Sequence, residues 1–274
     1  MLPLAFAVLL EMRFATEGLG LGTAAQASPR PRECRGAASG DDGLWLRLRG
    51  SDAMRYCDLL ARGYARLQQT PKEALSAARA ADALAGPTPA AAVLTGRAQL
   101  RLTQIALAYE QFAQAESADA RAFADPKALH DYARAASLSQ KPEQAVRLYR
   151  SLMSRAALLD DARERAFAQI EAAAHVLALT PNGADEALGY LGQARGQTLG
   201  LSAWVNGLRL LALRQSGRAE QRTWGALPSV ASLGTPPPAG FSEQFPLLPA
   251  GQFEALRAAL TPPSEVTPRK VKAR

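Results

Sequence analysis

The residues of this sequence best suited to acid–base or metal chemistry are its two histidines, His130 and His175. Neither belongs to an H-x-x-H or H-E-x-x-H pattern, and no cysteine lies near either of them in the sequence. Metal sites in proteins need several ligands at defined spacings. We therefore expect both histidines to be groove or surface residues of helices, and we expect no metal and no other cofactor.

The acidic cluster Asp160, Asp161 and Glu164 is the other candidate for catalytic chemistry. It precedes Arg163 and Arg165, and negative charge at the start of a helix is favoured by the helix dipole. We interpret the cluster as a helix start. The chain contains no glycine-rich phosphate loop and no G-x-S-x-G nucleophile motif. The sequence therefore predicts a protein that is not an enzyme.

Helix breakers recur along residues 50–222 and divide this region into short segments of strong helix formers. The breakers are Thr70-Pro71, Gly86-Pro87-Thr88-Pro89, Asp125-Pro126, Lys141-Pro142, Thr180-Pro181-Asn182-Gly183 and Ser216-Gly217. Each combines a helix stop with a good start, such as proline at the first helical position. Because aromatic residues make up only 6% of the chain, Ala and Leu must form the core. This composition favours many stacked helices over one thick core.

A triplet of small and bulky residues occurs four times among these segments. The copies are Ala74-Ala78-Ala81, Ala108-Phe112-Ala115, Ala145-Tyr149-Leu152 and Ala187-Leu191-Ala194, with first members 34, 37 and 42 residues apart. Upstream of each triplet lies one small residue, which we call a crossing residue: Gly63, Gly96, Ala133 and Ala174. Two antiparallel helices cross closely only where both carry small side chains, and the bulky residue then fills the wedge to the next pair.

The order Gly96, Ala108, Phe112, Ala115 and Asp125-Pro126 resembles a tetratricopeptide repeat. The segment from Leu129 to Leu152 is similar, and looser copies begin near Leu59 and Ile170. The resemblance covers residues 55–215. It implies an all-α fold of about nine helices and no sheet, arranged as a right-handed superhelical array of antiparallel helix pairs, an α-solenoid. It also implies a scaffold that binds another protein.

In tetratricopeptide arrays the first helix of each pair lines a concave groove. The register of the crossing residues carries this role onto Tyr64, Arg97, Arg101, Lys127, His130 and Arg134. Arg97 and Arg101 are four residues apart and share a helix face, as do His130 and Arg134. Guanidinium groups bind carboxylates well, and no acidic residue belongs to this set. We therefore expect the groove to bind an acidic peptide or a partner's C-terminal carboxylate.

The net charge of +7 permits a second hypothesis, a basic adaptor for an anionic polymer such as nucleic acid or a cell-envelope polymer. Most of the arginines are spread singly along the predicted helices, which makes nucleic acid the less favoured partner. The same arginines are also explained as a solvated surface that keeps an Ala-rich protein in solution.

The first 27 residues have the features of an atypical signal peptide. An apolar run extends from Leu2 to Leu10 and is broken by Glu11 and Arg13, and Ala25-Gln26-Ala27 before Ser28 matches a cleavage site. We predict a periplasmic or secreted protein, with a cytoplasmic location as the alternative and Met12 as another possible start. No apolar run is long enough to span a bilayer.

Cys34 and Cys57 are the only cysteines. In an exported protein a disulfide between them would join the predicted linker, residues 28–49, to the first helix. Two unrelated thiols are the alternative. After the repeats, residues 223–274 contain nine of the 18 prolines. We predict that they form a largely disordered basic tail.

Overall fold

The computed structural model describes residues 31–34, 47–48, 50–180 and 182–194, together with positions 205, 208, 209, 212, 213 and 216. Within these residues the chain is all-α, and no strand occurs. The α-helices are α3 (Gly50–Arg66), α4 (Pro71–Ala85), α5 (Pro89–Arg101), α6 (Ile105–Ala118), α7 (Pro126–Leu138), α8 (Pro142–Met153), α9 (Ala162–Leu179) and α10 (Ala184–Ala194). Three short 3₁₀ helices accompany them: η1 (Arg32–Cys34), η3 (Ala120–Phe123) and η4 (Ala156–Leu158).

Most of the helices begin where the sequence predicts, whereas α6 begins at Ile105, where no breaker was predicted. Four of them start on the prolines of the predicted breakers, Pro71, Pro89, Pro126 and Pro142. Thr88 caps α5, Asp125 caps α7 and Asp161 caps α9, each by accepting a hydrogen bond from a backbone N–H of the first turn. Such caps satisfy N–H groups that have no partner within the helix. The prediction that Asp161 marks a helix start is confirmed.

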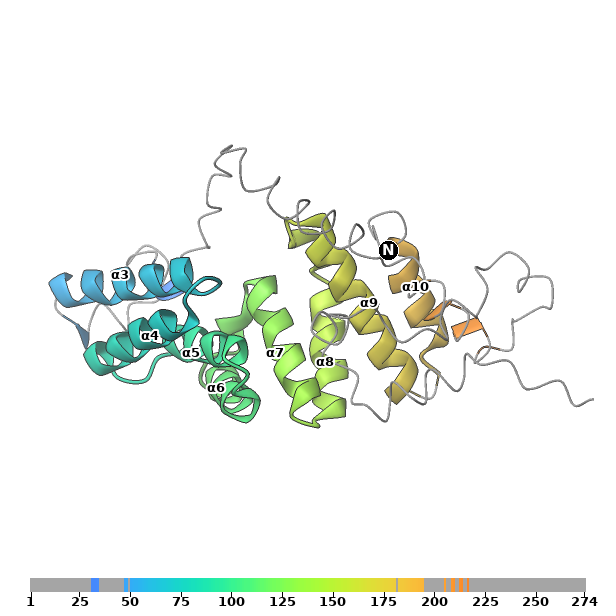
Figure 1. The fold of residues 1–274 in the computed structure, drawn as a ribbon, viewed down its shortest axis with the longest axis horizontal. Coiled ribbons are helices and arrows are strands. Elements are labelled where there is room, and N and C mark those ends of the chain that lie inside the picture. The colour runs from blue at the N-terminus through green and yellow to red at the C-terminus, as the bar shows by residue number, and fades with distance from the viewer. Residues whose placement is uncertain are drawn as a thin grey trace, which may run out of the picture.

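Consecutive helices pack against one another as pairs, α3 with α4, α5 with α6, α7 with α8, and α9 with α10. The pairs follow one another along the long axis of the molecule (Figure 1). We call α3, α5, α7 and α9 the first helices and α4, α6, α8 and α10 the second helices. The turns inside two pairs share one conformation, because Thr103 and Gln140 both adopt the left-handed region, at φ of 60° and 58°. Adjacent helix pairs that pack in this way are compatible with a helical repeat.

The predicted triplets form the packed interior of these pairs. All twelve of their residues are fully buried. Two of the crossing residues, Gly96 and Gly63, are small for a steric reason. A Cβ added to Gly96 would lie 2.8 Å from the ring of Phe112 and 3.1 Å from the carbonyl oxygen of Ala108. A Cβ added to Gly63 would lie 2.5 Å from Leu94 Cδ2. The close crossing of α5 and α6, inferred from Gly96, Ala108 and Phe112, is confirmed.

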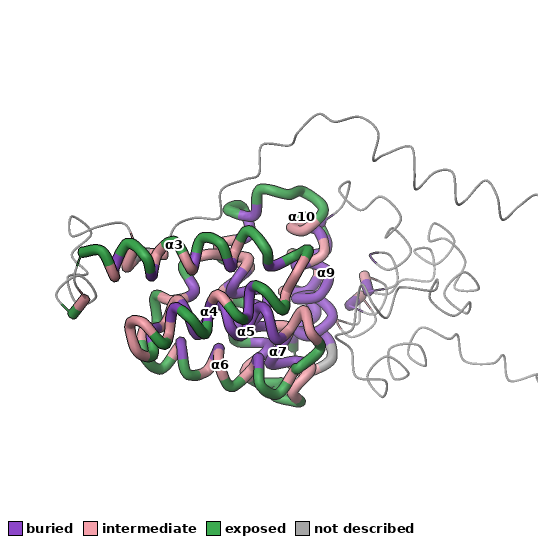
Figure 2. Tube along the Cα trace, turned by 60° about the vertical axis from the view of Figure 1, so that its left-hand side comes forward, coloured by how far each residue is buried: buried purple, intermediate pink, exposed green. Residues whose placement is uncertain are grey.

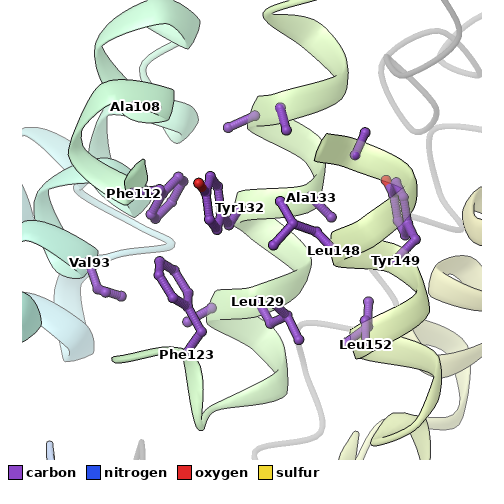
Figure 3. Close-up of a cluster of buried hydrophobic side chains, with 14 of the residues drawn as sticks. Val93, Ala108, Phe112, Phe123, Leu129, Tyr132, Ala133, Leu148, Tyr149 and Leu152 are labelled. Atoms are coloured by element: carbon purple, nitrogen blue, oxygen red, sulfur yellow. The ribbon is translucent and has the colours of Figure 1, made fainter. Parts of the chain in front are cut away.

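The largest apolar cluster lies at the junction of α5, α6, η3 and α7 and continues to α8. Its centre is aromatic: the ring of Tyr132 lies 5.4 Å from that of Phe112 and 4.9 Å from that of Phe123, between centroids (Figure 3). Burial is greatest along α5, α7 and α9 (Figure 2). These first helices are therefore enclosed by their neighbours rather than lying on an open surface.

The predicted boundaries are described only in part. The linker predicted at residues 28–49 contains η1, and Cys34 in η1 forms a disulfide with Cys57 in α3. The predicted signal peptide, residues 1–27, and the predicted tail, residues 223–274, lie outside the described residues. Beyond α10, Val205, Leu208 and Ala212 are buried in the cluster formed with α9 and α10. None of the described helices has the length and hydropathy that a bilayer crossing requires.

Candidate functional site: an ionic network across the first helices

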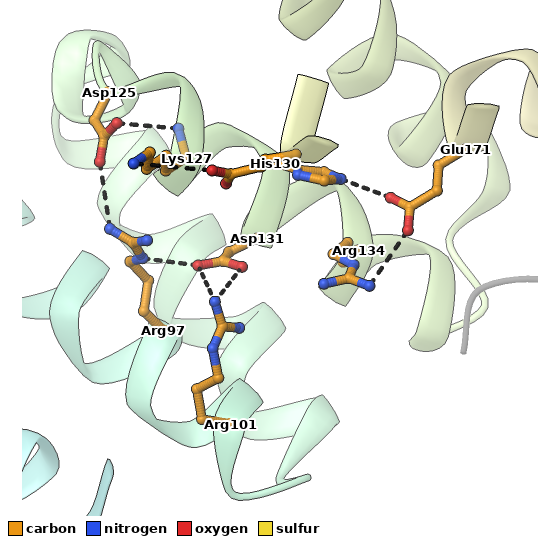
Figure 4. A network of polar contacts seen from close by, with 9 residues as sticks. Arg97, Arg101, Asp125, Lys127, His130, Asp131, Arg134 and Glu171 are labelled. Atoms are coloured by element: carbon orange, nitrogen blue, oxygen red, sulfur yellow. Dashed lines mark hydrogen bonds and ion pairs between the residues drawn. The ribbon is translucent and has the colours of Figure 1, made fainter. Parts of the chain in front are cut away.

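All six predicted groove residues lie on first helices, Tyr64 on α3, two on α5 and three on α7. The structure brings five of them together with four carboxylates that the sequence did not suggest as their partners. We call this set the ionic network (Figure 4): Arg97, Arg101, Asp125, Lys127, His130, Asp131, Arg134, Glu164 and Glu171.

The first part of the ionic network joins α5 to α7 through Asp131. Arg97 Nε donates to Asp131 Oδ2 at 2.7 Å, and Arg101 Nη2 donates to Oδ1 at 3.0 Å. Arg97 Nη1 also donates to Asp125 Oδ2 at 3.3 Å, on the residue that caps α7. Arg97 and Asp131 are only 5% and 3% exposed. Because a buried charge is tolerated only when it is paired, this contact is a structural link between two helix pairs.

The second part repeats this arrangement one pair further along, where Glu171 of α9 is held by two residues of α7. His130 Nε2 lies 2.6 Å from Glu171 Oε2, and Arg134 Nη2 lies 3.3 Å from Oε1. Tyr149 of α8 donates its hydroxyl to Oε2 at 3.2 Å. Glu171 is 1% exposed. In both parts, two residues four apart on one first helix hold a carboxylate of the next first helix.

His175 of α9 connects the backbone of Glu171 to Ser137 of α7 through two buried polar contacts. Its Nδ1 lies 2.7 Å from the carbonyl oxygen of Glu171, which can only accept, so the proton of a neutral ring is on Nδ1. Its Nε2 lies 2.7 Å from the Ser137 hydroxyl, and its ring packs on Tyr149 at 4.6 Å between centroids. His130 and His175 are 5% and 1% exposed. The expectation that both histidines are groove or surface residues is therefore wrong, because both face a neighbouring helix.

Opposing effects set the ionisation of the two central carboxyls. Burial disfavours the charged form of Asp131, but the charges of Arg101 and Arg97 outweigh it and lower its pKa to about 2. Burial is likewise outweighed at Glu171, whose pKa is lowered by Arg134 and by His130. Burial raises the pKa of Tyr64 to about 12, against the charge of Arg97. At neutral pH both carboxyls are therefore ionised, and the Tyr64 hydroxyl is neutral.

These residues do not form the expected groove of unpaired basic side chains. The four fixed positive charges of the ionic network are matched by its four carboxylates. Three cationic side chains keep some exposure: 25% for Arg101, 33% for Lys127 and 24% for Arg134. Arg97 and His130, in contrast, are buried, so the expectation that they are open to a ligand is wrong. Their helix faces point toward the next helix pair, where the carboxylates lie.

One repeat position makes such contacts in three of the four helix pairs. The residues that directly follow the crossing residues are Tyr64, Arg97, Arg134 and His175. The guanidinium carbon of Arg97 lies 5.8 Å from the centre of the Tyr64 ring, Arg97 binds Asp131, and Arg134 binds Glu171. Each of these contacts reaches the next first helix. Sequence reasoning missed Asp131 and Glu171 as partners, although Asp131 lies two residues before Ala133 and Glu171 lies three residues before Ala174.

A second set of ion pairs joins the second helices. Arg147 Nη2 of α8 lies 2.7 Å from Glu116 Oε1 of α6, and Arg150 Nη2 of α8 lies 2.8 Å from Glu186 Oε2 of α10. Both arginines are about half exposed. The described residues contain no group of three or more His, Cys, Asp or Glu side chains that could hold a metal ion.

Comparison of the chain with protein families, with curated proteins and with solved structures finds no match.

Proposed function

We propose that the protein is a non-catalytic interaction scaffold of the tetratricopeptide type. In this proposal the helix pairs form a right-handed superhelix, and a segment of another protein binds along the first helices. The observation that carries the proposal is the placement of Arg101, Lys127 and Arg134, which are partly exposed while buried or half-buried carboxylates hold their charged groups. Side chains fixed before binding lose less conformational entropy when a partner arrives.

Arg101 is the side chain best suited to contact a partner. Its hydrogen bonds to Asp131 use Nη2 alone, so Nε and Nη1 make no hydrogen bond within the described part of the chain. A carboxylate or backbone carbonyl of a partner can accept from these groups. Because the ionic network is balanced in charge, we expect recognition to depend on hydrogen bonds more than on long-range attraction. The same balance favours a peptide ligand over an anionic polymer, whose binding depends on unpaired positive charge.

The disulfide supports an exported location. Disulfides persist in oxidising compartments such as the periplasm and are rare in the cytosol. A bond between Cys34 and Cys57 is therefore consistent with the signal-peptide features of residues 1–27. We propose that the scaffold acts in the periplasm or outside the cell.

Affinity capture from the native cell fraction, followed by mass spectrometry, provides the partner, and calorimetry then measures its affinity. We expect the double variant Arg101→Gln and Arg134→Gln to weaken binding by about 1.5–3 kcal/mol, the size typical of hydrogen bonds to charged groups. The matched control is Arg147→Gln with Arg150→Gln, which removes two exposed charges from the second helices. Equal affinity of both double variants and the wild type would place the interface away from the first helices.

A further inference from the structure

The N-terminal segment is fastened to the array by two contacts that lie side by side in the sequence. Cys34 of η1 forms a disulfide with Cys57 of α3, across a Cα–Cα distance of 5.7 Å. The preceding residue of each partner makes the second contact, because the Tyr56 hydroxyl donates to the Glu33 carboxylate. The covalent bond therefore holds Glu33 beside Tyr56.

The Tyr56 hydroxyl also contacts the next helix pair. Its side chain is fully buried, and its hydroxyl lies 2.5 Å from Thr88 Oγ1. Thr88 is the residue that caps α5, where its Oγ1 accepts from the Ala91 backbone N–H. A continuous chain of contacts thus leads from η1 through α3 to the first turn of α5.

We propose that the Cys34–Cys57 disulfide is a redox-controlled clasp that holds η1 on α3 and keeps α3 and the start of α5 ordered. A dithiol reductant opens it: one thiolate of the reductant attacks Cys34 or Cys57 and forms a mixed disulfide, while the other cysteine leaves as a thiolate. The second thiol of the reductant then releases the first cysteine and becomes part of the reductant's own disulfide. The protein gains two electrons and two protons. Both cysteines are half-buried rather than enclosed in the core.

The clasp depends on the covalent bond because the remaining contact is weak on its own. Without the disulfide, the Glu33–Tyr56 hydrogen bond must offset the entropy of ordering η1 by itself. The bond also raises the effective concentration of Glu33 near Tyr56, as any tether does. Reduction therefore releases η1, removes the acceptor of Tyr56 and leaves the cap of α5 less well supported. This inference concerns the N-terminal end of the array and does not depend on the proposed binding face.

Hydrogen exchange of the full chain, followed by mass spectrometry with and without dithiothreitol, tests the clasp. We expect amides of α3 and of the first turn of α5 to exchange about tenfold faster after reduction, as expected for local opening. Amides of α9 are the internal reference and should not change. Equal exchange of α3 in the two redox states would overturn the proposal. An equal acceleration in α9 would overturn it too, because the bond would then stabilise the whole array rather than one end.

Two variants make the test specific. Cys34→Ser should show the fast exchange of the reduced protein without reductant, and dithiothreitol should not change it further. Glu33→Ala keeps the disulfide and removes the acceptor of the Tyr56 hydroxyl, so α3 should stay slow while the first turn of α5 exchanges faster. A Cys34→Ser protein that still responds to dithiothreitol would show that the response does not come from this bond.

Discussion

Arg97 Nε on α5 lies 2.7 Å from Asp131 Oδ2 on α7, and the two side chains are only 7% and 5% exposed. The same kind of contact joins Arg134 of α7 to Glu171 of α9. A displacement of one helix pair along the other would leave a buried charge without its counter-ion, which is far more costly than a poorly packed methyl group. The ion pairs therefore favour one register between neighbouring pairs.

We expect Asp131→Ala to lower the free energy of unfolding by about 3–5 kcal/mol, because it leaves Arg97 buried without its main partner. Urea denaturation measures the change. The control is Glu186→Ala, which breaks the pair with the half-exposed Arg150. That substitution should cost no more than about 1 kcal/mol. Similar costs for the two variants would contradict a structural role for the Arg97–Asp131 pair.

The lowered pKa of Asp131 predicts a loss of stability in acid. Its pKa falls from 3.8 to about 2 on folding, and a carboxyl with a lowered folded pKa stabilises the fold above its unfolded pKa. That contribution, about 2 kcal/mol at neutral pH, is lost as the pH falls from about 4 to about 2. The lowered pKa of Glu171 acts in the same direction.

Urea denaturation at several pH values between about 5 and 3 measures this dependence. The control is Asp131→Asn, which keeps the shape of the side chain but does not titrate. Its stability should fall less steeply with decreasing pH than that of the wild type, while the other carboxyls titrate in both proteins. Identical slopes would mean that Asp131 is not ionised more easily in the folded protein.

The sequence was sufficient for most helix starts and for the close crossing of α5 and α6. Proline and capping residues determine helix starts locally, so Pro89 and Asp161 could be interpreted without tertiary information. Crossing residues such as Gly96 are likewise visible, because their small size recurs at a fixed distance from each triplet. The register also placed the six predicted groove residues on first helices.

The burial and the ion-pair partners of the predicted groove residues could not be predicted in the same way. Asp131 and Glu171 pair with arginines of the preceding first helix because the facing sides of the two helices carry these residues. The rotation of each helix about its own axis determines which sides face each other, and helix periodicity in the sequence does not fix that rotation. The charge of Arg97 suggested an exposed residue, since arginine is rarely buried. Its pairing with Asp131, 34 residues away, and with Asp125 makes the burial tolerable. Removing Arg97 is therefore expected to destabilise the protein, because the buried Asp131 would lose one of its two arginine partners.

The location can be tested on protein purified from its native cells. We expect the mature chain to begin at Ser28 and to carry an oxidised Cys34–Cys57 pair. Intact-mass measurement with and without reduction gives both results, because loss of residues 1–27 and gain of two hydrogens each change the mass. A chain that begins at Met1, has free thiols and fractionates with the cytoplasm would contradict export.

Two glycine-to-alanine substitutions should change stability in opposite directions. At Gly96 the new Cβ would lie 2.8 Å from the Phe112 ring, in a crossing that has no room for it. Overpacking of this kind costs about 1–3 kcal/mol. Gly189 lies exposed in the middle of α10, where an added Cβ meets no atom within 4 Å. Alanine there should stabilise the protein by about 0.5–1 kcal/mol, because glycine loses more backbone entropy in a helix.

Thermal and urea denaturation of the two variants measure these changes, and each variant is the control for the other, since both make the same chemical substitution within a helix. If Gly96→Ala were as stable as the wild type, α5 and α6 could separate at this point without cost. The close crossing would then not explain why a glycine occupies position 96. If both variants gained stability, helix propensity alone would account for both glycines, and the register of the crossing residues would have to be reassigned.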